Sequence, residues 1–416
     1  MRKLENIFES KLLEELKYLP VHNFKKGEVL IKESEFVEFI PILLNGKIEV
    51  TQSSLKKIKT HVYYITPVQC CILSLVSGQK NLPSVGCGTV QEDSSIILVP
   101  PSTTKKWFNM YSSWRDFISG LYDHRLSELI HSRNLVQEQA NLIKNQKKEL
   151  TDSISYSKRI QNALLQSEKQ FVKNVPHSFI LNKPKDIVSG DFFWSKKINN
   201  RVLFAVADCT GHGVPGAMVS IVCYQTLEET ASNNPDAELG NILNKVREKI
   251  QQLFSANDDY LNDGMDISLC SLDSNSNILS YSGANNSIYR VTTLNDQEQY
   301  SKNEVINSEL KVIEYKADRQ AIGKVDNVIE FNTDYIEYLD GDSFYLTSDG
   351  FQDQFGGLRN KKLTKRRMKE HFLQNALFPL DKIVANLDVI FNQWKEEEEQ
   401  VDDVLIVGIK TYCNKT

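Results

Sequence analysis

Carboxylates recur beside apolar runs in the second half of this 416-residue sequence. A single aspartate next to glycine at the end of a strand is usually part of a turn. Several of them can instead serve one site, because strands fix side chains at a sheet edge and glycine lets a backbone carbonyl or a substrate approach closely. The aspartates with this placement are Asp191 after Ser189-Gly190, Asp208 after Leu203–Ala207, Asp349 after Phe344–Ser348, and Asp402 and Asp403 before Val404–Ile409.

A cluster of these carboxylates needs cations, since like charges in one place cannot all stay ionised without them. An all-oxygen ligand set favours Mg²⁺ or Mn²⁺ over zinc. Two such ions about 3.5–4 Å apart can bridge a water molecule and lower its pKa for in-line attack on phosphorus. The aspartates therefore predict metal-assisted chemistry on a phosphate group.

The elements that must position the aspartates lie in about residues 173–416. Apolar runs at 202–207 and 404–409 predict strands, and the spacing of apolar residues at 214–231, 237–254 and 380–394 predicts helices. This mixture predicts an α+β layered domain.

The first 120 residues carry short apolar runs separated by Gly, Pro, Asn and Ser, which predict a small barrel or jelly roll. Asn45-Gly46 lies between two runs and predicts a hairpin turn. Residues 107–121 are expected to be helical. The predicted strands contain Val29–Ile31, Ile40–Leu44, Val62–Ile65 and Ile96–Val99.

About residues 120–172 contain no proline and one glycine, and they predict a long helical linker, with domain boundaries after residues 120 and 172. A seven-residue repeat is typical of a coiled coil. A dimeric coiled coil and a single helix packed on the C-terminal domain are both open, because the partner row contains the polar Lys147 and Gln161 beside Ala140 and Ile154. The seven-residue row reads Leu129, Val136, Ile143, Leu150, Ser157, Leu164, Phe171.

Composition narrows the function classes. The net charge of −5 argues against a nucleic-acid binder. The seven cysteines form no zinc or C-x-x-C pattern, which favours reduced thiols. No signal peptide and no apolar run of about 18 residues is found, so a cytoplasmic protein without membrane contact is expected.

Residues 173–410 resemble the PP2C-type (PPM) phosphatases, within the branch of SpoIIE and RsbU. The strongest match is Ala207–Ala217, which reads ADCTGHGVPGA. The order and spacing of the motifs extend over more than 200 residues. The other motifs are Lys183–Trp194, Gly264-Met265-Asp266, a "YAGAN"-like hairpin at Tyr281–Asn286, Ser348–Phe351 and Asp402–Val404.

The resemblance implies a PP2C-type β-sandwich flanked by helices and a metal-dependent protein serine/threonine phosphatase with two Mn²⁺ or Mg²⁺ ions. It implies a site in which a water between the ions is the nucleophile. The implied ligands are Asp208 for both ions, Asp191 and the Cys209 carbonyl for one, Asp349 and Asp402 for the other, Asp403 in a supporting place, and Asp266 or Asp263 for a third ion.

The implied substrate is a phosphorylated regulatory protein, such as a STAS-type anti-anti-sigma factor. A non-catalytic scaffold that binds a phosphoprotein, or a hydrolase of small phosphate compounds, remains open. So does the role of His212, as a general acid or as part of a flexible loop. A basic cluster has two interpretations, a solvated helix face or recruitment of an acidic phosphoprotein: Lys361, Lys362, Lys365, Arg366, Arg367, Lys369.

The first segment resembles the cyclic-nucleotide-binding β-roll of CRP-type regulators, on Phe24–Leu30, Leu44–Val50 and Glu92–Ile96. Residues 74–90 contain no arginine or glutamate, so the charge-assisted contact to a cyclic phosphate is missing. The resemblance implies a sensor domain that acts through a dimeric helical linker on the enzyme.

Overall fold

The chain forms two compact units, Met1–Asn145 and Gln146–Thr416. A computed structural model describes residues 4–53, 59–255, 263–273, 276–294, 305–323 and 328–412. The boundaries after residues 120 and 172 remain predictions. No helix in these ranges is long and apolar enough to cross a membrane. Six cysteines are free and buried, whereas Cys413 lies outside the described residues.

The first unit is built around a sheet with the order β1-β6-β3-β4, to which β2 and β5 add at β6 and β3. One apolar cluster, with Leu43, Val50 and Ile96, lies on one face, and a second places Trp107 and Trp114 against Ile42. The elements are α1 (Ser10–Lys17), β1 (Val21–Phe24), β2 (Val29–Ile31), β3 (Ile40–Ser53), β4 (Lys59–Ile65), β5 (Gln69–Cys70), α2 (Ile72–Gln79), β6 (Cys87–Val99), α3 (Pro101–Met110) and the start of α4 (Ser112–Leu164).

The hairpin predicted at Asn45-Gly46 is wrong. β3 continues through both residues, and its pairing with β6 shifts register on either side of Asn45. Gly46 has φ +98°, and a Cβ there would collide with Ser94 on the neighbouring strand. The glycine therefore forms a bulge, in which an extra residue kinks one strand without reversing the chain.

The helix predicted at 107–121 is divided in two, and the predicted linker helix is interrupted only near its C-terminal end. Tyr111, with an extended backbone, separates α3 from α4, so residues 107–121 belong to two helices. α4 ends at Leu164, and α5 (Glu168–Asn174) begins after Ser167, whose side chain accepts the N–H of Gln170. A serine in this position satisfies a free amide at the start of a helix. Four apolar residues of the seven-residue row are more than 60% exposed: Leu129, Val136, Ile143 and Leu150.

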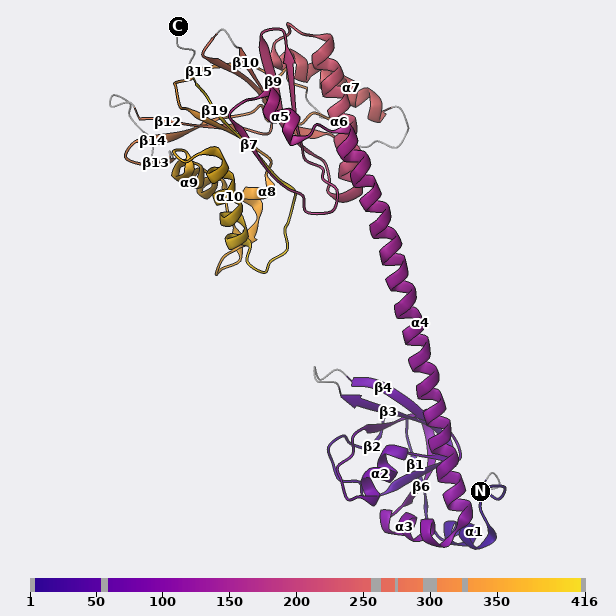
Figure 1. The fold of residues 1–416 in the computed structure, drawn as a ribbon. Helices are drawn as coiled ribbons and strands as arrows, with labels where there is room; N and C mark the ends of the chain where they lie inside the picture. The colour runs from indigo at the N-terminus through magenta and orange to yellow at the C-terminus, as the bar shows by residue number, and fades with distance from the viewer. Residues whose placement is uncertain are drawn as a thin grey trace. The chain divides into compact units, whose positions relative to one another are not determined.

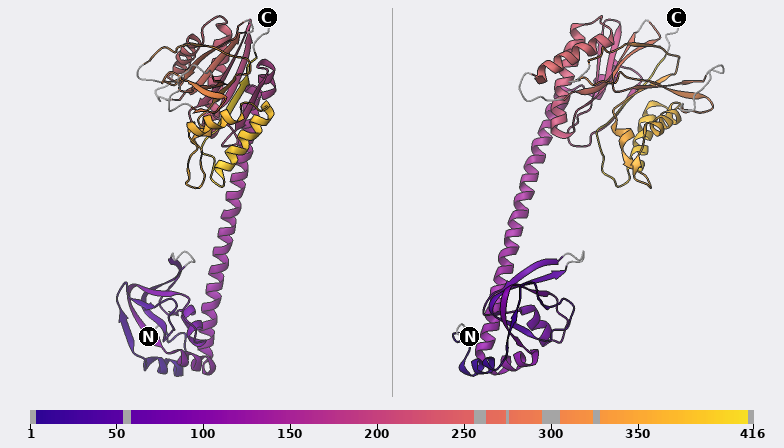
Figure 2. Two further views of the ribbon diagram at one scale, coloured as in Figure 1. Left: turned by 90° about the vertical axis from the view of Figure 1, so that its left-hand side faces the viewer. Right: turned by 180° about the vertical axis from the view of Figure 1, so that it is seen from behind.

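The second unit contains two large antiparallel sheets with helices packed on them (Figures 1 and 2). One sheet has the order β15-β11-β10-β9-β8 and the other β13-β14-β12-β16-β19-β7. The strands are β7 (Ser178–Lys183), β8 (Phe192–Ile198), β9 (Arg201–Cys209), β10 (Met265–Asp273), β11 (Ile278–Ala284), β12 (Ile288–Thr293), β13 (Val305–Ile306), β14 (Leu310–Tyr315), β15 (Asp334–Glu337), β16 (Ser343–Thr347) and β19 (Val404–Lys410), with a small pair β17 (Phe355–Gly356) and β18 (Lys361–Lys362).

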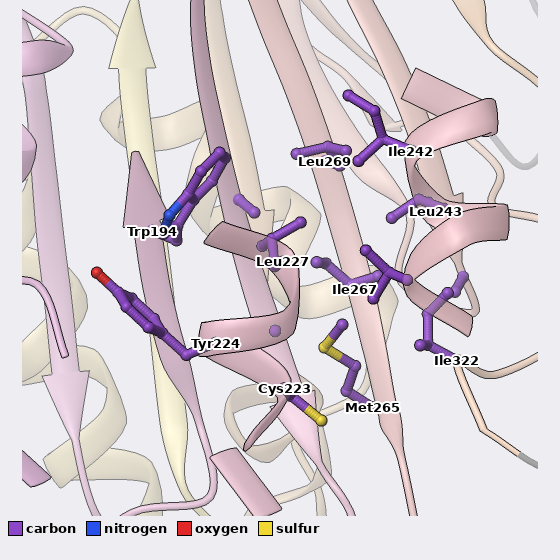
Figure 3. Packing of buried hydrophobic residues seen from close by; sticks show 14 of the residues in the cluster. Trp194, Cys223, Tyr224, Leu227, Ile242, Leu243, Met265, Ile267, Leu269 and Ile322 are labelled. Carbon is purple, nitrogen blue, oxygen red and sulfur yellow. The ribbon is translucent and has the colours of Figure 1, made fainter. Parts of the chain in front are cut away.

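Three apolar layers hold this unit together. α6 (Gly213–Asn233) and α7 (Leu239–Ser255) cover the β8–β9–β10 sheet, where Trp194, Leu227 and Ile267 meet (Figure 3). Phe204 and Phe344 lie in the layer between the two sheets. α9 (Lys365–Asn375) and α10 (Leu380–Lys395) cover the second sheet, after the short α8 (Gly350–Asp353). The result is a sandwich of two sheets with helices on both outer faces, the arrangement that the sequence resemblance implies.

The predicted hairpin at Tyr281–Asn286 is also wrong. β11 pairs with β10 and β15, whereas β12 pairs with β14 and β16, so the segment carries the chain from one sheet to the other. Asn285, at φ +55°, makes the bend. Asparagine tolerates this left-handed conformation better than most residues.

Candidate active site

Three of the predicted aspartates form a row across one sheet. Side chains alternate between the faces of a strand, and in β9 Phe204 and Val206 point into the layer between the sheets. Asp208, two residues after Val206, lies on the same face of the strand as Phe204 and Val206. Asp266 on β10 is its direct partner, and Asp191 immediately precedes Phe192, the partner of Ala207.

The second sheet brings the remaining aspartates to the same end of the sandwich. Asp349 follows β16, and Asp402 and Asp403 precede its neighbour β19. The N–H of Ser348 donates to the carbonyl of Leu405 at 2.9 Å, which continues this pairing up to the aspartates. Each sheet therefore contributes part of one carboxylate cluster.

A cleft of about 220 Å³ opens at this cluster. Asp208, Asp266, Asp349 and Asp402 all line it, together with Cys209, whose side chain belongs to the helix-facing core. Asp191 and Asp403 are buried behind it, with exposures of 4% and 3%. Within the described residues, no three His, Cys, Asp or Glu side chains converge closely enough to form a ready metal-ligand group.

Burial and mutual repulsion perturb these carboxyl groups. Burial, followed by the charge of Asp349 and then Asp402, raises the pKa of Asp208 well above its ordinary value. Burial and the charge of Asp208 likewise raise the pKa of Asp191. Burial and Asp402 raise the pKa of Asp349 to about 6, although Lys362 opposes the shift. A shared increase of this kind marks a place suited to a positive ion.

Asp191 supplies the most specific sign of a missing partner. Its Oδ2 atom is buried and has no hydrogen-bond partner. A buried carboxylate oxygen without a donor is costly unless a cation or another group balances it. The oxygen-only chemistry of the cluster and this unpartnered atom fit a hard divalent cation.

Asp403 is committed to backbone groups. Its two oxygens accept the N–H groups of Lys185 and Gly190, both at 2.7 Å. A Cβ at Gly190 would stand 2.6 Å from the Gly211 carbonyl oxygen, so only glycine fits there. Asp403 thus joins the second sheet to the segment that carries Asp191.

Two further residues of this region were not predicted. Gln161, near the end of α4, is 2% exposed, and its amide donates to the Ser189 carbonyl at 2.6 Å and to Ser220 Oγ at 3.1 Å. Its own oxygen accepts the Ser189 N–H at 3.3 Å. Asn285 donates to Asp266 at 2.9 Å. A polar residue in the otherwise partly apolar row that also holds Ala140 and Ile154 is the only sequence signal for Gln161.

The loop after Asp208 lies at the mouth of the cleft. Gly211 and Gly213 have φ values of +86° and +66°, which glycine adopts without strain. His212 between them lines the cleft, with Nδ1 3.0 Å from Asp186 Oδ2. The hydrogen bond fixes the orientation of the imidazole ring.

The basic cluster is divided by its contacts. Lys362, Arg366 and Lys369 form ion pairs with carboxylates of the same unit, namely Asp353, Glu370 and Glu314. Lys361 and Arg367 line a separate groove.

The sequence model of the family described as Stage II sporulation protein E (SpoIIE) matches residues 198–412. Asp191 precedes that range, so its assignment depends on its register beside Asp208. Comparison with the curated proteins gives no match.

Several solved structures are similar. The SiaA-PP2C domain of Pseudomonas aeruginosa is 28% identical, with a TM-score of 0.55, over 64% of this chain and 98% of that chain. The PP2C phosphatase domain with a regulatory fragment of SpoIIE from Bacillus subtilis is 15% identical, with a TM-score of 0.44, over 56% and 62%. The serine/threonine phosphatase PstP/Ppp of Mycobacterium tuberculosis is 14% identical, with a TM-score of 0.39, over 57% and 98%.

The family match covers more than half of the chain, and the SiaA domain is similar to it in both sequence and fold. The chain therefore belongs to the SpoIIE family and is a metal-dependent enzyme of the PP2C type, a protein serine/threonine phosphatase.

Proposed function

We propose that the aspartate cleft removes phosphate from a phosphoseryl or phosphothreonyl residue of a regulatory protein, such as a phosphorylated STAS-type anti-anti-sigma factor. The cluster of carboxylates from two sheets around the cleft is the observation that carries this proposal. The cleft is small and polar, as a site for a phosphorylated side chain at a protein surface must be. The family membership supports the class of reaction, and the substrate itself is part of the proposal.

One group of residues in the cleft would bind the metal ions, and a second group positions those ligands. Asp208 would serve two Mn²⁺ or Mg²⁺ ions, Asp191 and the Cys209 carbonyl one of them, and Asp349 and Asp402 the other. Asp266 would contact a third ion. Bound divalent cations lower the pKa of a water molecule and neutralise the charge of a phosphate group.

The neighbouring groups keep this arrangement in order. Asp403 fixes the Gly190 N–H, which sets the position of Asp191 next in the chain. Asn285 orients Asp266. No serine or cysteine nucleophile is required, and the Cys209 thiol lies in the core on the opposite face.

The test is Mn²⁺-dependent hydrolysis of p-nitrophenyl phosphate by the full chain. Activity is expected in the wild type and is expected to be lost in Asp208→Asn. If the wild type binds Mn²⁺ in calorimetry but hydrolyses nothing, the alternative of a non-catalytic phosphoprotein scaffold takes its place. A panel of phosphoproteins against small phosphate esters then separates a protein phosphatase from a hydrolase of small compounds.

We also propose that the first unit acts as a CRP-like sensor and that α4 forms a homodimeric coiled coil. The exposed apolar row from Leu129 to Leu150 supports pairing with a second copy. Gln161 supports a route from α4 to the Asp191 segment. Equal phosphatase rates for the full chain and for Gln146–Thr416, which retains Gln161, would count against control by the first unit.

A further inference from the structure

A second cavity lies on the helical layer that follows Asp349 in the chain. It has a volume of about 690 Å³ and runs between the β17–β18 turn, α9 and the end of α10. We define this basic groove by six of its lining residues: Leu358, Arg359, Lys361, Arg367, Trp394 and Glu396. The proposed mechanism uses none of them.

The charge of the basic groove is positive and unsatisfied. Arg359, Lys361 and Arg367 are exposed, and none of them forms an ion pair with a carboxylate in the described part of the chain. Glu396 is the one carboxylate of the lining. Burial lowers the pKa of the adjacent His371, so arginine and lysine alone supply the positive charge.

The basic groove also offers an apolar contact surface. The Arg367 guanidinium lies 4.5 Å from the centre of the Trp394 ring, and Leu358 is fully exposed beside it. Stacked arginine and tryptophan keep a planar, partly apolar surface with a free positive edge. An occupant with both carboxylates and an apolar side chain matches this combination.

Hydrogen bonds hold the basic groove in a fixed shape. Trp394 Nε1 donates to the Gln354 carbonyl at 3.0 Å, and the Gly357 N–H donates to the Trp394 carbonyl at 2.9 Å. Gly357 has φ +64°, and a Cβ there would stand 3.1 Å from the indole ring. A surface formed in advance loses less conformational entropy when it binds.

The same segment connects the basic groove to the active site. α8 begins at the residue after Asp349, and Lys362, next to Lys361, pairs with Asp353 of α8 at 2.8 Å. The charge of Lys362 also opposes the rise in the pKa of Asp349. A short stretch of chain therefore runs from Asp349, which lines the cleft, to Lys361, which lines the basic groove.

We propose that the basic groove binds an acidic, leucine-containing segment of the phosphoprotein substrate, apart from its phosphorylated residue. This rests on the proposed function, since it assigns a second contact to the same substrate. The contact supplies affinity and selectivity, while the cleft supplies the chemistry.

The experiment uses the full chain and three synthetic peptides. The first is a phosphoserine peptide joined by a Gly-Ser linker to a tail of Glu and Leu, made with several linker lengths. The second replaces Glu by Gln, and the third is a fluorescein-labelled tail without phosphoserine. The variant is Arg359→Gln with Arg367→Gln. Arg366→Gln is the matched control, because Arg366 is exposed on α9 next to Arg367 but pairs with Glu370 outside the groove.

In the wild type the Glu tail is expected to lower KM relative to the Gln tail. Each arginine substitution is expected to reduce that advantage about two- to fivefold, the size of an exposed charge contact. Hydrolysis of p-nitrophenyl phosphate by the double variant should equal that of the wild type, and Arg366→Gln should behave as the wild type with every peptide.

Equal KM values for the Glu and Gln tails, or equal tail affinity for wild type and double variant in anisotropy, would overturn the proposal. So would a change of oligomeric state in the double variant, which would make the groove an interface between copies. Absence of p-nitrophenyl phosphate hydrolysis by the wild type would instead refute the proposed function. In that case the fluorescence anisotropy of the unphosphorylated tail would still measure binding to the basic groove.

Discussion

Asp349→Asn is expected to stabilise the metal-free protein while it removes activity. Asp349 is surrounded by Asp402, Asp353 and Asp266, and its pKa of about 6 shows that its charge is unfavourable in the folded state. Asparagine has nearly the same shape and no charge. The substitution therefore removes a repulsion that only a bound cation would otherwise balance.

The magnitude follows from the pKa. A value of about 6 instead of the ordinary 3.8 corresponds to about 3 kcal/mol for the ionised form. Allowing for solvent screening of a partly exposed group, we expect a gain of about 2 kcal/mol in the free energy of unfolding at neutral pH. For a domain of this size, each kcal/mol corresponds to about 2–4 °C in Tm.

The sign depends on pH. A carboxyl with a raised folded-state pKa contributes stability below its unfolded pKa, and this contribution is lost as pH rises through the folded pKa. In EDTA the wild-type protein should lose this contribution of Asp349 to the free energy of unfolding between about pH 4 and pH 6. Asp349→Asn has no such contribution to lose. The advantage of the variant should thus be full at about pH 7.5 and mostly absent at about pH 4.

The assay is thermal unfolding in EDTA at both pH values, with p-nitrophenyl phosphate hydrolysis in Mn²⁺ as the functional measurement. Asp342→Asn is the control, because Asp342 is a buried aspartate paired with Arg290 at 2.5 Å. Breaking that pair should destabilise the protein by about 3–5 kcal/mol. A lower Tm for Asp349→Asn in EDTA, or a gain that does not vary with pH, would refute the reasoning.

Three further substitutions test the groups behind the cleft. Gln161→Ala removes three buried hydrogen bonds and should raise the Mn²⁺ concentration for half-maximal p-nitrophenyl phosphate hydrolysis, since a buried unpaired group costs about 1–3 kcal/mol. Gly190→Ala places a methyl group against the Gly211 carbonyl and should lower Tm in EDTA by overpacking worth about 1–3 kcal/mol. Asp403→Asn replaces one accepting oxygen by an NH₂ group that faces a backbone N–H. It should lower the free energy of unfolding by about 1–3 kcal/mol, whereas Asp349→Asn should raise it. An unchanged Tm in thermal unfolding would contradict this prediction.

Asp208, Asp402 and Asp403 could be placed at strand ends from the sequence, because they border apolar runs that are typical of buried strands. Asp208 follows such a run directly, and the structure places it at the end of β9. The pairing of Asp208 with Asp266, and the approach of Asp349 from the other sheet, depend on contacts between distant segments. Local patterns contain no information about those contacts.

The features that the sequence analysis misjudged or missed depend on contacts that a local pattern does not show. Asn45-Gly46 has the composition of a hairpin turn, but the same left-handed glycine also forms a bulge within a continuing strand. Gln161 interrupts a row of apolar residues in the sequence. The sequence does not show that its side-chain amide donates a hydrogen bond to the buried Ser189 carbonyl. Asn285 is hidden in a similar way within a bend.

The division of the cluster between two sheets makes ion binding and sheet docking one equilibrium. Neither sheet alone carries all of the proposed ligands, since Asp208 belongs to one and Asp349 to the other. Any ion held there cross-links the sandwich and stabilises the docked state by mass action. Conversely, a substitution such as Phe344→Leu, in the layer between the sheets, would weaken ion affinity without contacting an ion. The ion affinity of the proposed site therefore reports on the stability of the contact between the two sheets.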